Sequence, residues 1–189
     1  MQKTILVTLV LTLTWAVPER AQSTASNMTK GIAIDVTNAD IQATLRKTAS
    51  APVSDQQIRV VSINNGEYNV GIGVLHRSRS SAGGGAIEHS EITEIYQITE
   101  GTGTLVTGGT IENPKHSPAD GEVVKVLAGP STTGGPVKNG VSRKVGPGDI
   151  IIIPPSTAHW FSEITSDQVV YTVIRVDSRK VLPAGFGAK

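Results

Sequence analysis

The sequence predicts an all-β domain, and its composition and one turn signal support this fold class. Val, Ile and Thr recur along 189 residues that include 20 glycines and 10 prolines, while aromatic residues make up only 4%. Such a composition is typical of short strands joined by tight turns. The pair Asn65-Gly66 separates two β-rich runs, QIRVVSI and EYNVGIGVLH. Because Asn-Gly is the strongest short-range hairpin signal, we expect a hairpin centred there.

One folded domain is expected, preceded by a signal peptide over residues 1–25. A short basic start containing Lys3 precedes the apolar run ILVTLVLTLTWAV, which ends at Pro18. The run is too short to span a bilayer comfortably, and small and polar residues follow it, as in signal peptides. We therefore expect a secreted or periplasmic protein that leaves the membrane after cleavage; an uncleaved anchor is the alternative. The length suits a single domain, over residues 30–189.

The remaining elements are predicted from their periodicity. A short helix is expected within TNADIQATLRKTA, which begins with capping residues and places Ile41 and Leu45 on one face. The segment EITEIYQITEGTGTLVTGG predicts a second hairpin that turns at Gly101–Gly103.

Later segments are less regular. Residues 110–144 are rich in turn formers and predict a long excursion with one strand at VVKVLAG. GPGDIIIIPP predicts a buried strand at residues 150–153, and AHWFSEI and QVVYTVIRV predict the last strands.

The net charge and the absence of cysteine limit the partners and the metal ligands that this chain can have. The chain carries 17 basic and 16 acidic residues and a formal net charge of +1. No excess of charge is available to bind nucleic acid or anionic lipid, so we expect neither partner. Without cysteine, any metal ion must be held by nitrogen and oxygen ligands.

Candidate ligands lie in two contexts suited to a metal site. His89 shortly precedes the predicted strand that contains Glu94, and His159 follows the isoleucine run and a Pro-Pro corner. Alternation along a strand places Glu94, Tyr96 and Ile98 on one face. Two imidazoles and one carboxylate leave coordination positions open, as catalytic metal sites require. Two unrelated histidines are the alternative.

Residues 148–163 resemble the second sequence motif of the cupin superfamily. That motif has a glycine, five residues, a proline, four residues with a glycine among them, a histidine and then usually an asparagine. Gly148, Pro154 and His159 fall in register here, whereas Ser156 replaces the usual glycine and Glu163 the usual asparagine.

Residues 83–101 resemble the first cupin motif, which carries a His-x-His pair, a glutamate and a glycine. Glu94 and Gly101 keep the glutamate-to-glycine spacing, and His89 takes the place of the second histidine. The first place is occupied by Ile87, which cannot be a ligand. Glu91 is the candidate substitute, either as a fourth ligand or as a general base, with a solvated loop carboxylate as the alternative.

The resemblance covers about residues 60–177 and implies a double-stranded β-helix, or jelly-roll barrel, with a metal at one open end. It implies a metal ligand set of His89, Glu94 and His159, with Glu91 and Tyr96 as candidate catalytic residues. Dimers are common in the family, so a homodimer is one expected state.

Two main functions follow from this resemblance. The first is a metal-dependent enzyme, of dioxygenase, isomerase or lyase type, that acts on a small organic molecule at the barrel mouth. The ion would be Mn, Zn, Fe or Ni, with iron disfavoured by export. The second is a non-catalytic module that binds a small ligand or sugar, supported by the missing first histidine; a storage-like cupin is a third alternative.

Other residues have expected places too. The wall of the mouth is expected to contain Tyr96, Phe161 and Tyr171, with Arg175 as an anion contact. His76 is expected to be a hydrogen-bonded histidine of the barrel, and His116 to face solvent.

Overall fold

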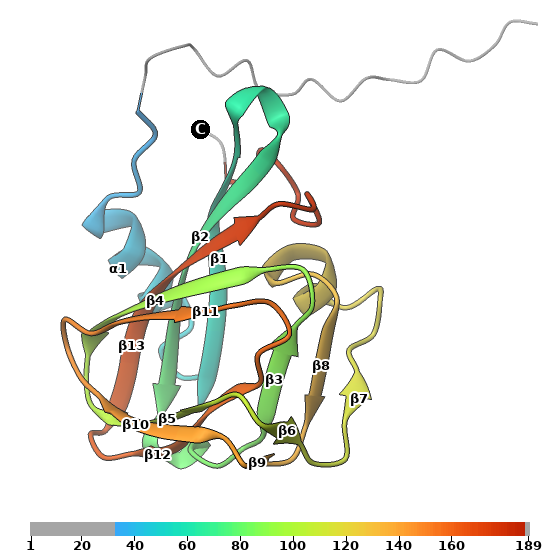
Figure 1. Cartoon of the computed structure of the whole chain (residues 1–189). Helices are drawn as coiled ribbons and strands as arrows, with labels where there is room; N and C mark the ends of the chain where they lie inside the picture. Colours follow the sequence, from blue (N-terminus) through green and yellow to red (C-terminus); the bar gives the residue numbers. More distant parts are fainter. Residues whose placement is uncertain (1–32, 188–189) are drawn as a thin grey trace, which may run out of the picture.

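Two antiparallel sheets face each other in the computed structural model, which describes residues 33–187 (Figure 1). In spatial order, the five-stranded sheet contains β1 (Val53–Ile63), β2 (Tyr68–Ser78), β13 (Gln168–Asp177), β4 (Thr93–Glu100) and β11 (Ile150–Ile153). The six-stranded sheet contains β10 (Val141–Val145), β5 (Gly103–Thr107), β12 (His159–Ile164), β3 (Ala86–His89), β8 (Ser131–Gly134) and β7 (Lys115–His116). A small ribbon contains β6 (Thr110–Ile111) and β9 (Val137–Lys138). The predicted signal peptide lies outside the described residues.

The chain path is that of a double-stranded β-helix. The run β2–β5 pairs antiparallel with the run β10–β13 in reverse order: β2 with β13, β3 with β12, β4 with β11 and β5 with β10. Both runs pass alternately between the two sheets. Two chain segments therefore wind together around one interior, and the predicted all-β jelly roll is confirmed.

The predicted hairpin and helix are also confirmed. β1 and β2 pair through Ile63 and Tyr68, and Asn65 between them adopts a positive φ of 56°, which asparagine tolerates better than most residues. The helix α1 (Asn38–Lys47) is capped by Thr37, whose Oγ1 accepts from the backbone N–H of Asp40 at 3.1 Å. In the part of the chain that is described, no helix is long and apolar enough to cross a membrane.

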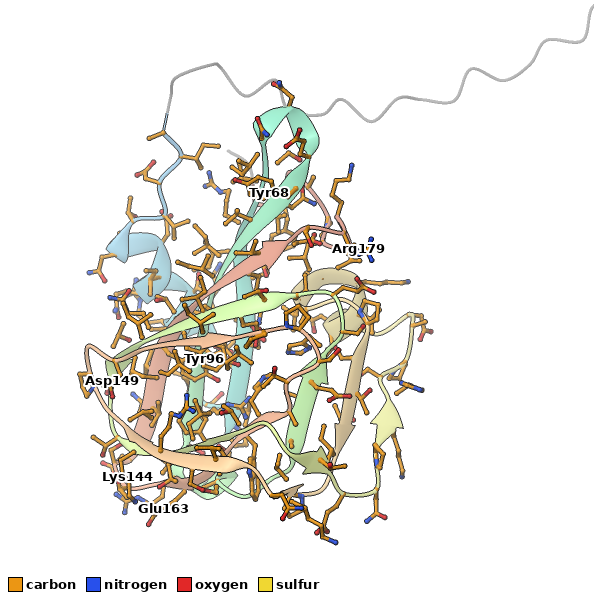
Figure 2. The ribbon with its side chains drawn as sticks, viewed as in Figure 1. Tyr68, Tyr96, Lys144, Asp149, Glu163 and Arg179 are labelled. Carbon is orange, nitrogen blue, oxygen red and sulfur yellow. The ribbon has the colours of Figure 1, made fainter. Side chains whose placement is uncertain are left out.

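Glu163 lies at the end of the molecule opposite the β1–β2 turn (Figure 2). Tyr68 lies beside the β1–β2 turn at one end, and the ion pair between Lys144 and Glu163 lies at the other (Figure 2). Glu163 occupies the place of the usual motif asparagine. It is exposed and paired with Lys144 at 2.7 Å, so it takes no part in the interior.

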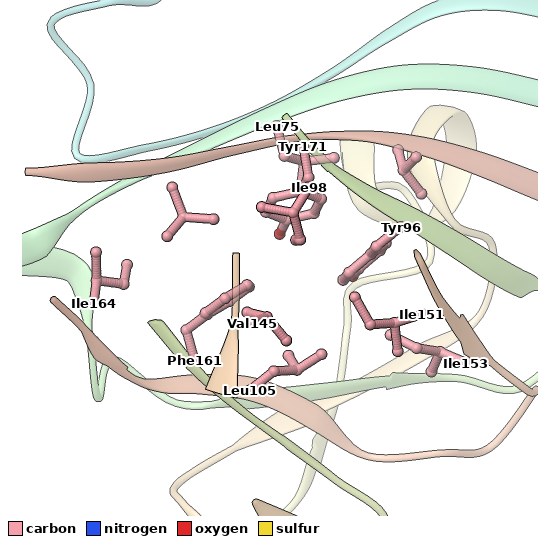
Figure 3. Close-up of a cluster of buried hydrophobic side chains, with 12 residues drawn as sticks. Leu75, Tyr96, Ile98, Leu105, Val145, Ile151, Ile153, Phe161, Ile164 and Tyr171 are labelled. Atoms are coloured by element: carbon pink, nitrogen blue, oxygen red, sulfur yellow. The ribbon is translucent and has the colours of Figure 1, made fainter. Parts of the chain in front are cut away.

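The interior between the sheets is filled by side chains from both (Figure 3). The expected wall residues are part of this core: the rings of Tyr96 and Tyr171 lie 4.4 Å apart, and those of Phe161 and Tyr171 lie 5.7 Å apart. The whole cluster contains Leu75, Tyr96, Ile98, Leu105, Val145, Ile151, Ile153, Phe161, Ile164, Val169, Tyr171 and Val173.

The prediction of a second hairpin at Gly101–Gly103 was wrong. Both flanking strands exist, but β4 belongs to the five-stranded sheet and β5 to the six-stranded sheet, so the chain turns a corner between sheets. Gly101 has a φ of 76°, and a Cβ at this position would collide with the carbonyl oxygen of Gln168. Only glycine fits this corner without displacing its neighbour.

The excursion over residues 110–144 was also predicted incorrectly. Its apolar run is not a strand but a π-helical turn, η3 (Val123–Leu127), in which only Leu127 is buried. The strands of this region are instead β6, β7, β8, β9 and most of β10.

The isoleucine strand β11 forms where predicted but is buried on one face only. Ile151 and Ile153 belong to the core, whereas Ile150 and Ile152 are 65% and 64% exposed. β11 is the last strand of the five-stranded sheet, and no described element covers its outer face.

Candidate metal centre

His89, Glu94 and His159 come together between the two sheets. His89 is the last residue of β3 and His159 the first of β12, while Glu94 lies in β4 of the facing sheet. One ligand atom from each residue lies within 4.8 Å of the others, and all three side chains are buried. The three residues named from the motifs therefore share one place in the fold.

The corner before β12 connects the two motifs. The backbone N–H of Ser156 donates to the carbonyl oxygen of His89 at 2.7 Å, which holds the end of β3 against this corner. Ser156 has a φ of 56°. This left-handed conformation explains why a glycine is usual at this place of the motif, and the serine adopts it nonetheless.

The hydrogen bond of His159 determines which of its nitrogens is free. Its Nδ1 lies 2.9 Å from the carbonyl oxygen of Thr157, which can only accept, so Nδ1 carries the hydrogen. In the neutral ring Nε2 then presents a lone pair. Nε2 is buried and has no hydrogen-bond partner among the described residues.

His89 is held in the same tautomer by a longer chain of hydrogen bonds. Its Nδ1 lies 2.7 Å from Oγ of Ser131, and that hydroxyl donates its single proton to the carbonyl oxygen of Gly129 at 2.8 Å. The hydroxyl oxygen must therefore accept from Nδ1 of His89. Nε2 of His89 also presents a lone pair to the centre.

Glu94 faces both imidazoles with one carboxylate oxygen. Its Oε1 accepts from Nε of Arg175 at 3.0 Å, and its Oε2 accepts from the hydroxyl of Tyr96 at 2.9 Å. The same Oε2 lies 3.6 Å from Nε2 of His89 and 3.4 Å from Nε2 of His159. Three lone-pair atoms thus converge, and no proton lies between either imidazole and the carboxylate.

The protonation states agree with this geometry. Burial lowers the pKa of His89 to about 4 and also lowers the pKa of His159, so both rings are neutral at neutral pH. Burial alone would raise the pKa of Glu94, but His89, Arg175, His159 and the Tyr96 hydrogen bond outweigh it and lower this pKa to about 2. Tyr96 keeps its proton, because burial and the charge of Glu94 raise its pKa well above the ordinary value.

A divalent ion fits this donor set. Two ligands at about 2.0–2.1 Å from one tetrahedral ion lie roughly 3.3–3.4 Å apart. The distances of 3.4 and 3.6 Å from Glu94 to the two imidazoles are close to this spacing. A cation would also remove the repulsion among three buried lone pairs, and the second nitrogen of each imidazole already has the partner that metal-bound histidines usually have.

Two further site predictions have different outcomes. Glu91 lies outside the converging group and forms an ion pair with Arg179 at 3.3 Å, which matches the alternative of a loop carboxylate. Arg175, expected as an anion contact in the wall of the mouth, is fully buried and bonded to Glu94, Gln57 and Asp55. No local sequence pattern indicates this cluster, because β13 meets β4 only through the pairing of distant segments.

The other histidines lie elsewhere. His116 is exposed, as predicted. His76 is buried on the outer face of the five-stranded sheet, where it lines a hollow of about 340 Å³ beside the end of α1. No described residue hydrogen-bonds its ring, so the expected hydrogen-bonded histidine is not found.

No protein-family model matches the sequence, and no curated protein is similar to it. Solved structures do match. A protein from Bacillus halodurans is 13% identical with a TM-score of 0.46, over 78% of this chain and 84% of that one. A conserved protein with a double-stranded β-helix domain from Klebsiella pneumoniae is 11% identical with a TM-score of 0.42, over 70% and 82%. A cupin protein from Bacteroides fragilis is 17% identical with a TM-score of 0.35, over 64% and 75%. The order and register of its own strands establish that this chain has the double-stranded β-helix fold of the cupins that its motifs resemble.

Proposed function

We propose that this chain is a metal-dependent enzyme that acts on a small organic molecule, with one divalent ion held by His89, Glu94 and His159. The observation that carries the proposal is the convergence of one ligand atom from each of these three buried side chains. Among residues 33–187, the Tyr96 hydroxyl alone donates a hydrogen bond to any of the three atoms, at Oε2 of Glu94. Buried groups of this kind are costly unless a cation joins them.

The chemistry expected of such a centre is that of a Lewis acid. A bound ion would polarise an oxygen atom of the substrate, and three protein ligands would leave coordination positions for it. Tyr96 keeps its proton on the hydroxyl that donates to Oε2 of Glu94, and so orients that carboxylate. Ser131 and the Thr157 carbonyl orient the imidazoles. Mn, Zn, Fe and Ni all suit nitrogen and oxygen ligands.

A non-catalytic module that binds a small ligand or sugar is the second candidate. It is favoured by Ile87, which stands where the motif has its first histidine. The two candidates differ in whether the ion has exchangeable positions. A module with a structural ion, or with no ion, has none.

Metal analysis of the purified protein tests the proposal. We expect one equivalent of metal in the wild-type chain and in His116→Ala, which changes an exposed histidine, and little in His89→Ala or His159→Ala. Circular dichroism checks that each variant folds. An absence of metal from the wild type after dialysis against each of the four ions would refute the proposal.

Water relaxation separates the two candidates. With Mn²⁺ bound, an open site enhances the relaxation of bulk water protons through exchanging ligand water, and a small substrate that displaces this water reduces the enhancement. Stoichiometric Mn²⁺ without any enhancement would favour the non-catalytic module.

We also propose that the mature protein acts outside the cytoplasm, on the strength of the basic start and apolar run in residues 1–25. N-terminal sequencing of exported protein tests this, and a chain that still begins at Met1 would contradict it.

A further inference from the structure

His76 lies on the outer face of the five-stranded sheet, beneath the helix α1. Its neighbour Leu75 points into the core, so strand alternation turns His76 outward. In the sheet it stands between Ser54 of β1 and Val170 of β13, and α1 packs on β1 and β2. The residue is only 4% exposed, and its side chain points away from the candidate metal centre.

Two hollows meet at this histidine. The larger, of about 340 Å³, lies between the loop that joins α1 to β1 and the adjoining ends of β2 and β13. The smaller, of about 170 Å³, lies between α1 and β13. Ala49, His76 and Gln168 line both, so the two hollows adjoin. Small-molecule sites usually enclose about 300–1,000 Å³, and the larger hollow alone falls within this range.

The imidazole of His76 has no hydrogen-bond partner among residues 33–187. The unpartnered polar atoms that are sealed from solvent in this part of the chain belong to Asp55, Arg59, His159 and Trp160. The nitrogens of His76 are therefore open to the hollows that its side chain lines. Buried polar groups nearly always have a partner, so this ring is placed as a contact for a molecule that the chain itself does not supply.

The charges around the hollows balance. Glu100 and Arg46 line the smaller hollow. Asp167 lines the larger one and pairs with Arg79 at 3.2 Å. Two carboxylates thus stand beside two guanidinium groups, and Oε1 of Glu100 also accepts from the side-chain amide of Gln168 at 3.0 Å. No excess of either sign is left to select an ion, which favours a neutral ligand.

The wall offers donors and acceptors together. A neutral imidazole carries one of each, and the hydroxyls of Ser78 and Ser80 in the larger hollow serve as both. Leu45, Pro52 and Val170 add apolar surface. An alcohol group matches such a wall, because it donates and accepts without charge, and the C–H surface of a polyol suits the apolar side chains.

We propose that the hollow beneath α1 binds a small neutral polyhydroxyl molecule of sugar or cyclitol size, with His76 as its central hydrogen-bonding contact. The site is distinct from the candidate metal centre, because the five-stranded sheet separates the two. It therefore does not depend on the enzyme activity proposed above.

Nuclear magnetic resonance of the four histidines tests this site on the purified full-length protein. Each imidazole gives its own Hε1 signal, and His76→Leu and His116→Ala assign the two outside the metal centre. With myo-inositol or glucose as the probe, we expect the His76 signal to shift and saturate, and the signal of the exposed His116 to stay in place. The dissociation constant should be about 1–10 mM, as for a ligand of about a dozen heavy atoms with low binding efficiency.

Two phenylalanine variants place the probe. Ala49→Phe fills the part that both hollows share and keeps His76, so it should raise the dissociation constant by about tenfold or more. Ala184→Phe is the matched control, because it adds the same ring to an exposed alanine outside both hollows, and it should leave the constant unchanged. Circular dichroism shows that both variants fold.

The absence of a saturable His76 shift up to about 100 mM of either neutral probe, roughly tenfold above the expected constant, would overturn the proposal. Equal shifts with the charged probes putrescine and malonate would also overturn it, as would equal binding by the two phenylalanine variants. Shifts confined to His89 and His159 would do the same, because the probe would then occupy the metal centre.

Discussion

Replacing Arg175 with methionine is expected to destabilise the fold strongly. Arg175 is 1% exposed, and its guanidinium donates to Glu94 at 3.0 Å, to Gln57 at 2.9 Å and to Asp55 at 2.5 Å. The other Asp55 oxygen already lacks a hydrogen-bond partner among the described residues. Methionine has a similar length, so the variant removes the charge and the donors with little change in packing.

The cost follows from the charges left behind. Removing one partner of a buried ion pair typically costs about 3–5 kcal/mol, because the remaining charge stays buried and unpaired. Here two carboxylates, Glu94 and Asp55, lose the same cation. We therefore expect a loss of about 3–5 kcal/mol, a large part of the stability of a typical domain.

Urea unfolding of the metal-free protein measures this loss, since a bound ion would compensate the charge of Glu94. The control is Lys144→Met, which breaks an ion pair with Glu163 at 2.7 Å whose side chains are 73% and 55% exposed. Surface pairs contribute about 0–1 kcal/mol, so this control should be nearly neutral. A loss below about 1 kcal/mol for Arg175→Met, or equal losses for both variants, would refute the reasoning.

Two further predictions concern the sheet corner and the buried histidine. Gly101→Ala should lower the free energy of unfolding in urea by about 2–4 kcal/mol, because its Cβ meets the carbonyl oxygen of Gln168. Gly148→Ala is the control: this glycine also has a positive φ, but its Cβ would enter open space, so the loss should be about 1 kcal/mol. In the metal-free protein, the free energy of unfolding should fall by about 3 kcal/mol as the pH drops from about 6.5 to 4. Over this range His89 is protonated in the unfolded chain but stays neutral in the folded protein, where its pKa is about 4. His89→Asn should reduce this slope, leaving the part due to His159, and His116→Asn should leave it unchanged; unfolding curves across this pH range that are unchanged by His89→Asn would contradict the assignment.

The parts of the fold that the sequence predicts are those that depend on local chemistry. Asn65 adopts the positive φ of its turn, and Thr37 caps its helix. The candidate metal ligands were predictable for the same reason. Pro154 and His159 belong to one short corner between β11 and β12, and strand alternation predicts which face of β4 carries Glu94.

The parts that were missed depend on pairing between distant segments. Gly101 looks like a hairpin glycine, but β4 finds its partners in β11 and β13 rather than in β5. Arg175 meets Glu94 across 81 residues of sequence, so the buried ion pair had no local signal. The exposure of Ile150 and Ile152 depends on β11 being an edge strand, a property of the whole sheet.

The isoleucine at the first motif place leads to a last prediction. Ile87 precedes His89 by two residues in β3, so their side chains share a face, and it lies directly opposite His159 in β12. A side chain at position 87 therefore lies beside both imidazoles. Ile87→His should add a third nitrogen ligand and tighten Zn²⁺ binding by about tenfold or more. Loss of a residue that only hydrogen-bonds a metal ligand already lowers metal affinity by about 10- to 100-fold, so a direct ligand should contribute at least the lower value. Competition with a chelator measures this affinity, and Glu88→His, which projects from the opposite face of β3, is the control. Equal affinities for the two variants would place position 87 outside the site, and the open coordination position would then have to face another strand.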